Sequence, residues 1–486
     1  MGEATVMLLL TEGLSSRVGA EIGDRLSRAD LGRWLAQVQQ VGSCAQPIRV
    51  VGASDTIDVA TGEVLRSYAS HDEPDGVTYL RCKNRRRVVC ESCSHEYQGD
   101  VFHLIMAGAA GGMKNVPAEI VTHPLVFATL TAPSFGPVHA AKKPGQRGTR
   151  RCRPRSGKAR QVCPHGRPVW CMSTHQHGDG VVGQPLCSDC YDYLGHLVWQ
   201  WWAPQLWRRF TIALRRGLAR HLGLSETACR QLVRVQFAKV AEFQRRGVIH
   251  FHALIRLDGP PTADTAFPPP AVQVDADVLV DLVGAAAARV SYEAPAVDGS
   301  DVVRLLRFGG QVDTRPVHGQ ADRENTTGIE LHPETVAAYV AKYATKAAAD
   351  IATDGTPNPH LRHLKKLVGK VSLRAGFAGL TGADGQYKGW SRWADMLGFR
   401  GHFASKSRRY STTLGRLRQA RRDHVRSRLH PLPSSDPVRV GDDADLAELE
   451  ADSTLVIGSW RFAGIGWLTS GDAALAAASA ARARDD

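Results

Sequence analysis

Three features common in other proteins are missing from this sequence of 486 residues. It has no Gly-x-x-x-x-Gly-Lys-Ser/Thr phosphate loop, so we expect no helicase activity of its own. It has no uninterrupted apolar run long enough to span a bilayer. The segment Met1–Gly13 lacks the basic cluster that opens a signal peptide. These absences predict a cytoplasmic protein.

The sequence also has fewer acidic than basic residues. It contains 48 Asp and Glu and 61 Lys and Arg, which gives a net charge of +13. That excess favours a polyanionic partner, nucleic acid before an anionic membrane. The region 397–428 is especially basic and also holds Ser, Thr and Tyr hydroxyls that suit phosphate oxygens. A solvated basic helix is the alternative for residues 416–428. We predict DNA contacts from Arg400, Lys406, Arg408, Arg409 and Tyr410.

Ten cysteines are present, and in a reducing compartment their clustering favours zinc over disulfides. A redox role for the Cys-x-x-Cys pairs is disfavoured because no βαβ pattern surrounds them. Several residues compete as ligands: His95 in the first group, and Cys152, His165, His175 and His177 in the second. We predict about two structural zinc ions, one held by Cys44, Cys82, Cys90 and Cys93 and one by Cys163, Cys171, Cys187 and Cys190.

The segment Glu242–His252 (EFQRRGVIHFH) is predicted to form a hairpin with a turn at Gly247. Side chains alternate along a strand, so His250 and His252 share one face. Glu242 would lie on the facing strand and complete a set of three metal ligands with open positions. Mg²⁺ or Mn²⁺ suits such a site when the substrate is a phosphate. The alternative is that one histidine packs in the core and the other is solvated.

The run from Thr335 to Ala349 is rich in alanine and is predicted to be a helix, with Pro333 and Glu334 in its first turn. Tyr339 and Tyr343 are four residues apart and therefore share a face. Each is followed three residues later by a lysine, Lys342 and Lys346. A phenol is a poor nucleophile at neutral pH unless a cation or a metal helps it to ionise. The alternative is an amphipathic helix with its tyrosines in the core.

Together, the histidine pair and the tyrosine helix resemble the HUH endonuclease superfamily, in which Val126–Thr131 would be the preceding strand motif. More closely, the chain resembles the RepSA type of replication initiators of actinobacterial plasmids and integrative elements. The stretches that carry this likeness are Thr129–His139 (TLTAPSFGPVH), Cys187–Tyr193 (CSDCYDY) and Leu397–Thr413 (LGFRGHFASKSRRYSTT).

The resemblance implies an α+β fold in which an antiparallel sheet with flanking helices carries the metal hairpin and the phenols face the metal. It implies a rolling-circle initiator that nicks one strand of origin DNA. Tyr339 and Tyr343 would form 5′-phosphotyrosyl links, and Lys342 and Lys346 would steady the charge. Partners would be single- and double-stranded origin DNA, a host helicase and a DNA polymerase. A two-tyrosine transposase or relaxase, or a non-catalytic zinc-containing regulator, are the alternatives.

We therefore expect four regions along the chain. Residues 1–115 would hold a cysteine-rich zinc module, and 116–350 the nuclease domain with an inserted zinc module at about 150–195. Residues 351–430 would be a basic DNA-binding region, followed by an acidic linker and a C-terminal helical segment in 431–486.

Overall fold

The computed structural model describes residues 15–141, 151–155, 162–318, 331–344, 358–380, 385–429 and 454–485. These residues form a mixed α+β protein with antiparallel sheets, which confirms the expected class. The chain divides into two compact units. The terminal unit combines Met1–Gln98 with Gly415–Asp486, and the central unit is Gly99–Leu414. No helix among the described residues is long and apolar enough to cross a membrane.

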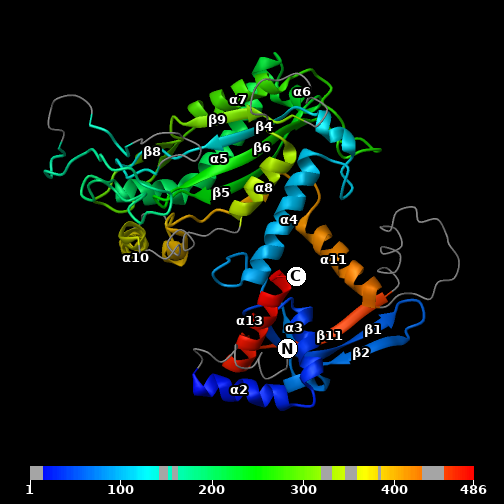
Figure 1. Ribbon diagram of the computed structural model, residues 1–486. Helices are drawn as coiled ribbons and strands as arrows, with labels where there is room; N and C mark the ends of the chain where they lie inside the picture. Colours follow the sequence, from blue (N-terminus) through cyan, green and yellow to red (C-terminus); the bar gives the residue numbers. More distant parts are fainter. Residues whose placement is uncertain are drawn as a thin grey trace. The chain divides into compact units, whose positions relative to one another are not determined.

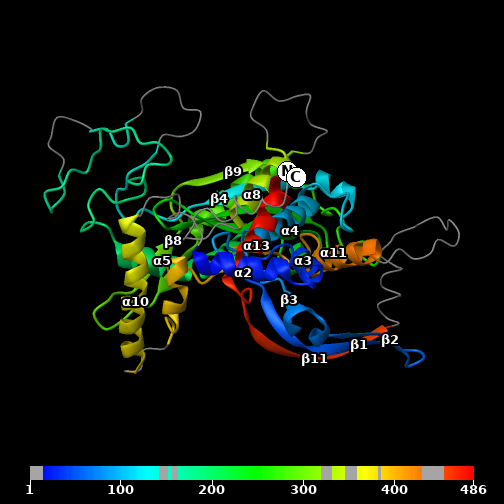
Figure 2. The same ribbon diagram turned by 60° about the horizontal axis from the view of Figure 1, so that its bottom comes forward.

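The terminal unit is built on a sheet in the order β11-β1-β2, with β3 also paired to β1 (Figures 1 and 2). The pairing of β1 with β11 runs the full length of both strands, so the C-terminal segment belongs to the same sheet as the N-terminal one. Trp467, which follows β11, packs against Trp34 and Tyr79 with ring centroids 5.6 and 4.6 Å apart. The elements are β1 (Ile48–Asp58), β2 (Val64–Ala69), β3 (Thr78–Leu80), β11 (Thr454–Ile465), α2 (Ser16–Ser27), α3 (Leu31–Gln40) and α13 (Ser470–Asp485).

A buried ion pair fastens the two ends of the terminal unit together. Nε of Arg25 on α2 donates to Oδ1 of Asp472 on α13 at 2.7 Å, and both side chains are almost inaccessible. Its Nη2 also donates to Asp75 at 2.7 Å. A buried arginine without such carboxylates would be costly, so this pair fixes where α13 docks on α2.

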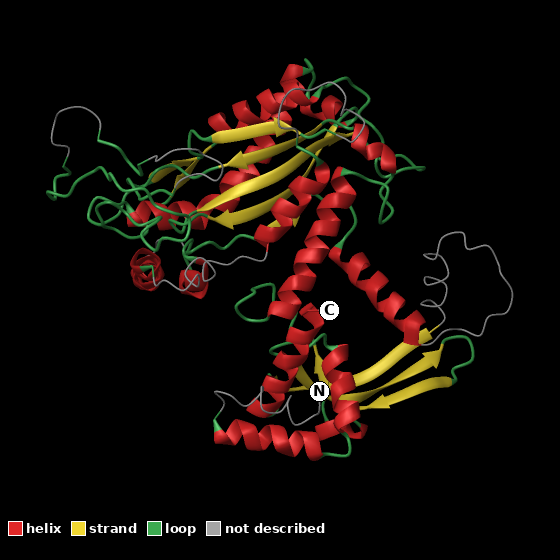
Figure 3. Ribbon diagram, in the orientation of Figure 1, coloured by secondary structure: helices red, strands yellow, loops and turns green. Residues whose placement is uncertain are grey.

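The central unit contains a five-stranded antiparallel sheet in the order β10-β5-β6-β4-β9 (Figure 3). Alternation along β6 sends neighbouring side chains to opposite faces. The ring of Phe251 lies 5.6 Å from that of Trp207 on α5 (Tyr193–His221). The ring of His252 lies 5.2 Å from that of Tyr339 on α8 (Pro333–Ala344), so these helices cover opposite faces. The strands are β4 (Leu125–Leu130), β5 (Arg234–Phe243), β6 (Ile249–Asp258), β9 (Val312–Pro316) and β10 (Ala404–Lys406).

Helices and a small ribbon surround this sheet. The longest helix, α5, buries Trp199, Trp201, Trp202 and Trp207, so its tryptophans form core rather than a base-stacking surface. Two helices, α4 and α11, carry the chain between the units. The remaining elements are α4 (Glu91–Ala109), α5 (Tyr193–His221), α6 (Glu226–Arg230), α7 (Ala276–Arg289), β7 (Ser291–Ala294), β8 (Arg304–Arg307), α8 (Pro333–Ala344), α10 (Pro359–Leu380) and α11 (Leu414–Leu429), with short 3₁₀ turns at Ser70–Asp72, Pro74–Gly76, Ala118–Thr122 and Trp390–Met396.

A lysine lies inside the core of the central unit. Lys239 of β5 is 5 % exposed and places its Nζ 4.7 Å from the ring centroid of Phe251. Its one described hydrogen bond goes to the carbonyl oxygen of His402 at 3.1 Å. Burial without a facing carboxylate lowers the pKa of Lys239 to about 7.

This lysine predicts an unusual pH dependence of stability. Between the folded pKa of about 7 and the unfolded value of about 10.4, the unfolded chain binds one more proton than the native one. Stability should therefore rise with pH in this window, by up to about 1.4 kcal/mol per pH unit. In Lys239→Met that contribution should be missing, so the melting temperature of the variant relative to wild type should fall steadily from pH 7 to pH 10. Lys388→Met, at an exposed position, is the control; equal pH profiles for both variants would contradict the prediction.

Candidate active site and metal-binding groups

The hairpin of β5 and β6 is closed by a turn at residues 244–248, in which Gly247 has a φ of +79°. The backbone conformation therefore favours glycine, and a Cβ at this position would also come within 2.6 Å of the Leu361 side chain, which would have to shift. The turn fixes the register and pairs Glu242 directly with His250. The predicted hairpin is thereby confirmed.

Three ligand atoms converge on the α8 face of this hairpin. Oε2 of Glu242 lies 2.9 Å from Nε2 of His250 and 2.8 Å from Nε2 of His252, and the two ring nitrogens are 3.1 Å apart. Two imidazoles and one carboxylate on one side of a point form a facial ligand set that leaves other positions open. The arrangement therefore fits a divalent ion, and both histidines belong to one group.

The protonation states of these groups suit metal binding. Burial alone would raise the pKa of Glu242, but hydrogen bonds from His250 and His252 outweigh it and lower the pKa to about 2. Burial lowers the pKa of His252, only partly offset by its hydrogen bond to Glu242. An ionised carboxylate and a neutral imidazole are the forms that bind metals.

Strand β4 supplies groups that hold the ring of His252. Thr129 is paired with His252 in the sheet, and its Oγ1 lies 3.0 Å from Nδ1 of that ring. The ring of Phe127 stacks on the imidazole at 5.7 Å with an interplanar angle of 10°. A partner on the second nitrogen fixes the orientation of a ligating imidazole. The strand motif Val126–Thr131 therefore supplies residues that orient the His252 ring.

Both tyrosines of α8 face this site. The ring centroids of Tyr339 and Tyr343 lie 5.2 and 6.0 Å from that of His252 and 4.8 Å from each other. Burial is the main cause that raises the pKa of each phenol, and the charge of Glu242 adds to it. The core-facing side of α8 consists of other residues, Pro333, Val336, Ala337, Val340, Ala341 and Ala344.

Of the two lysines in the tyrosine motif, Lys342 lies within the described residues. Lys342 is exposed and places its Nζ 5.9 Å from the ring centroid of Tyr343. Lys346 lies outside the described residues.

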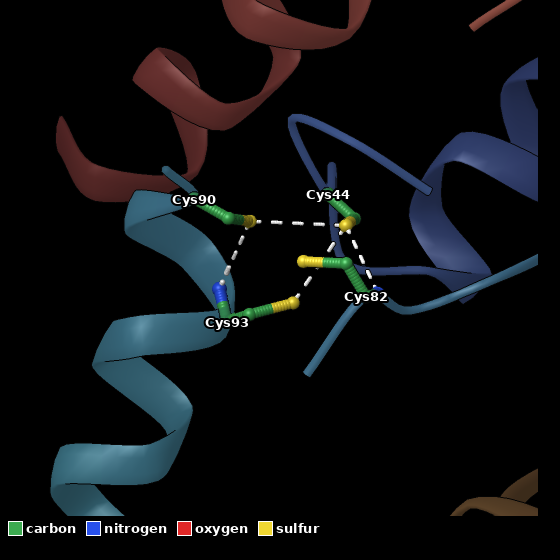
Figure 4. Close-up of side chains that lie close together, drawn as sticks. All are labelled: Cys44, Cys82, Cys90 and Cys93. Carbon is green, nitrogen blue, oxygen red and sulfur yellow. Dashed lines mark hydrogen bonds between the residues drawn. The ribbon is translucent and has the colours of Figure 1, made fainter. Parts of the chain in front are cut away.

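A group of four thiols lies in the terminal unit, where Cys44, Cys82, Cys90 and Cys93 turn their sulfur atoms toward one another (Figure 4). Sγ of Cys44 is 3.7 Å from Sγ of both Cys90 and Cys93. Tetrahedral zinc with Zn–S bonds of about 2.3 Å requires sulfurs about 3.8 Å apart, so these thiols fit that ion. Backbone N–H groups also point at the sulfurs, for example Ala45 to Cys90 at 3.3 Å. His95 is exposed and is not part of the group.

The second predicted ligand set needs a correction. Cys163, Cys187 and Cys190 lie together, but their fourth partner is His165, whose Nδ1 is 3.2 Å from Sγ of Cys190 and 3.8 Å from Sγ of Cys187. A turn in which the N–H of Cys163 donates to the carbonyl of Arg167 at 2.8 Å brings His165 to this position.

Cys171 lies in a different group, beside His139, Cys152 and His175. A two-way backbone pairing of Cys171 with Arg153, at 2.8 and 2.9 Å, carries it there. His139 was not among the predicted ligands, although it is the last residue of the Thr129–His139 stretch.

The prediction that Tyr410 contacts DNA needs a correction, because the structure places this side chain in the core. Its side chain is completely buried, its hydroxyl donates to the carbonyl of Ile105 at 3.3 Å, and its ring lies 5.0 Å from the guanidinium of Arg256. Arg256 is itself buried and paired with Asp258 at 2.7 Å. Tyr410 is therefore a core residue that covers a buried ion pair.

Two of the other predicted contacts also have partners within the protein. Nζ of Lys406 donates to the carbonyl of Ser411 at 3.1 Å, and burial lowers its pKa to about 8. The guanidinium of Arg400 stacks on Trp201 and Trp202 at 4.4 and 4.7 Å from the ring centroids. Both side chains are half-buried, so less of their charge is accessible to DNA than the basic sequence around them indicates.

Arg408 and Arg409 are exposed and line a pocket of about 340 Å³ at the beginning of β5. Glu226 is the one acidic residue among the lining residues, and it pairs with Arg230 at 3.7 Å. The pocket is therefore strongly cationic. Its arginines are Arg215, Arg230, Arg234, Arg408 and Arg409.

Comparison with known proteins agrees with the resemblance drawn from the motifs. The family described as "Replication initiator protein, pSAM2" (RepSA) matches residues 30–481. A replication initiator protein from Streptomyces ambofaciens is 41% identical over 465 residues, which cover 94% of this chain and 92% of the relative. No solved structure matches this chain. Because the match takes in both units and the candidate metal-binding groups of the described residues, the chain belongs to the RepSA family of replication initiator proteins.

Proposed function

We propose that this replication initiator acts at an origin as an HUH-type nuclease, nicking one DNA strand through attack by a tyrosine and thereby starting rolling-circle replication. The observation that carries the proposal is the position of two phenols, Tyr339 and Tyr343, directly against the ligand set of Glu242, His250 and His252. A nucleophile beside a divalent-ion site is the arrangement that phosphoryl transfer requires.

In the proposed reaction the phenolic oxygen bonds to the scissile phosphorus while the bond to the 3′ oxygen breaks. The phenol loses its proton, and the departing oxygen gains one to become a free 3′-hydroxyl, so the number of phosphoester bonds is unchanged. Mg²⁺ or Mn²⁺ bound by the ligand set would polarise the phosphate and offset its growing negative charge. Lys342, and Lys346 in the same motif, would add positive charge near the phenols.

Two nucleophiles on one helix face suit a reaction performed twice. The first tyrosine stays linked to the 5′ end while the free 3′-hydroxyl serves a host polymerase. The second can then attack when the origin is regenerated, after which reversal rejoins the strand. Since the chain lacks a phosphate loop, a host helicase would open the nicked duplex.

The test is covalent capture. The full chain is incubated with single-stranded origin DNA labelled at its 3′ end and with Mn²⁺, and the products are separated under denaturing conditions. We expect a labelled band at the mass of protein plus DNA that disappears with EDTA. Tight binding without any such adduct would contradict the proposal and favour a non-catalytic zinc-containing regulator.

For the structural metal sites, we propose zinc in the two groups that contain three or four cysteines. Four thiolates, or three thiolates and one imidazole, are ligand sets that zinc occupies in closed tetrahedral sites. The sets are Cys44, Cys82, Cys90 and Cys93 in the terminal unit, and Cys163, His165, Cys187 and Cys190 in the central unit.

The arginine pocket is the proposed contact with the DNA backbone. Arg408→Ala with Arg409→Ala should weaken duplex binding at low salt and reduce the slope of log affinity against log salt by about 1.8, or about 0.9 per lost phosphate contact. The double variant Arg220→Ala with Arg289→Ala removes the same charge at exposed positions outside the pocket and is the control. Equal slopes for the two double variants would mean that the pocket makes no phosphate contact.

A further inference from the structure

The group around Cys171 has the dimensions of a metal site. Nδ1 of His139 lies 3.2 Å from Nε2 of His175. Sγ of Cys171 lies 3.3 Å from that Nε2, and Sγ of Cys152 lies 3.9 Å from Nδ1 of His139. Zinc bonds of about 2.0–2.1 Å to nitrogen and about 2.3 Å to sulfur give tetrahedral edges of about 3.4 Å between nitrogens and about 3.6 Å between nitrogen and sulfur.

The surroundings of this group also suit bound metal. The N–H of Ala140 donates to Sγ of Cys152 at 3.2 Å, as expected for a sulfur that carries negative charge. The second ring nitrogen of His175 lies 3.7 Å from a carboxylate oxygen of Asp179, the kind of partner that orients ligating imidazoles. The backbone pairing of Arg153 with Cys171 brings the segments of the two cysteines together.

A second, independent observation is that residues 138–190, between β4 and α5, bury little apolar surface. Its described residues contain no helix or strand. Between residues 138 and 190, the buried apolar side chains among the described residues are Val182 and two of the proposed zinc ligands, Cys163 and Cys187. A segment that cannot bury apolar surface needs cross-links or metal ions to stay ordered.

We propose that His139, Cys152, Cys171 and His175 bind a second zinc ion in the central unit, and that its site is interleaved with the one at Cys163, His165, Cys187 and Cys190. In chain order the ligands come as four pairs: 139 and 152, 163 and 165, 171 and 175, 187 and 190. The first and third pairs make one site, and the second and fourth make the other. Each ion therefore closes a loop of the chain that contains one ligand pair of the other ion. Opening either loop should disturb both sites.

The interleaved module contacts the turn of the catalytic hairpin. Arg246 in that turn donates to the carbonyls of Ala132 and Pro133, where the chain leaves β4, at 3.3 and 3.1 Å. Gly183 lies so close to the same turn that a Cβ there would be 2.4 Å from the carbonyl carbon of Arg245. The two ions thus support the loop on which the register of Glu242 and His250 depends, which gives the module a positioning role.

The first test counts metal ions in the full chain. We expect three zinc ions per chain, and three ¹¹³Cd resonances after exchange, because the sites carry four, three and two thiolates. Cadmium at the nitrogen and oxygen ligands of the catalytic site would resonate far from all three. The pair Cys152→Ser and His175→Ala should remove the two-thiolate signal, whereas Cys229→Ser, at a buried cysteine outside every group, should keep three. Two zinc ions in the wild-type chain would overturn the proposal.

The second test measures the coupling between the sites. With a coloured chelator in excess, the three-thiolate zinc should leave at least tenfold faster from the Cys152→Ser, His175→Ala variant than from wild type. The four-thiolate zinc of the terminal unit serves as an internal control and should leave at an unchanged rate. Unchanged release from the three-thiolate site would overturn the interleaved arrangement, and the conservative variant His139→Gln, which keeps both thiols, gives the same comparison if the double variant folds poorly.

Discussion

Changing both Tyr339 and Tyr343 to phenylalanine is expected to abolish the covalent link to origin DNA, with a loss of more than about 10³-fold in adduct formation. Each change removes only a hydroxyl and keeps the ring, so contacts with Phe127 and His252 should survive. Zinc content and duplex affinity should therefore stay at wild-type values. The measurement is adduct yield on single-stranded origin DNA with Mn²⁺ under denaturing conditions.

The single variants test whether the tyrosines alternate. Each should still form an adduct, because both rings lie within reach of the same ligand set, but a full round of replication should fail in both. Burial, and after it the charge of Glu242, raises the pKa of both phenols, so the adduct of each single variant should depend on the divalent ion. We expect Tyr339 to initiate, on the grounds that it stands first in the doubled motif.

Two outcomes would contradict this arrangement. Full replication by Tyr343→Phe would leave Tyr339 as the single nucleophile. An adduct formed by the double variant would mean that α8 does not supply the nucleophile. Tyr292→Phe, in the β7–β8 ribbon, controls for the loss of a phenol elsewhere in the central unit.

The ligand set of the candidate active site could be read from the sequence because all of it is local. Three ligands fall within 11 residues of one hairpin, and alternation alone places both histidines on the same face. The tyrosine pair is equally local, since a spacing of four residues fixes a shared helix face. How close the helix lies to the hairpin could not be derived from spacing, because that depends on tertiary packing.

The cysteine groups show where local spacing misleads. Cys82 and Cys90 lie in one group, whereas Cys163 and Cys171, at the same spacing, lie in two different groups. Spacing states how far apart two ligands are along the chain but not which turn or backbone pairing each enters. The number of cysteines and histidines between residues 139 and 190 does indicate a further metal site, because one tetrahedral ion takes only four ligands.

Long-range pairing accounts for the other differences. The pairing of β1 with β11 joins segments about 400 residues apart in sequence, which no local pattern encodes. Tyr410 stands in a basic stretch that looks like a DNA-binding surface. Its ring is nevertheless needed to cover Arg256, and that need is visible only once β6 and the Tyr410 loop are seen together.

Removing a ligand from the hairpin is expected to have the second largest effect. His252→Ala should lower cleavage by about 10³-fold or more, because the ring is buried and makes the shortest contact with Glu242, while duplex binding should change less than about twofold. Glu242→Gln should require more Mn²⁺ for half-maximal cleavage and recover part of its activity at high metal, since an amide oxygen remains a weak ligand. Cleavage by His252→Ala at the wild-type rate in the presence of EDTA would refute metal assistance.

Thr129→Val separates metal binding from general damage to the sheet, because valine keeps the shape of threonine and its fit to a β-strand. The imidazole of His252 would lose its partner on Nδ1 while all three ligands remain. Loss of such a partner typically costs 10- to 100-fold in metal affinity or activity, so the variant should show an intermediate defect that additional Mn²⁺ relieves. Thr131→Val removes a hydroxyl that bonds the carbonyl of Gln311 at 2.6 Å, and its defect should not respond to metal. If both threonine variants respond to Mn²⁺ alike, Thr129 supports the strand rather than the ligand.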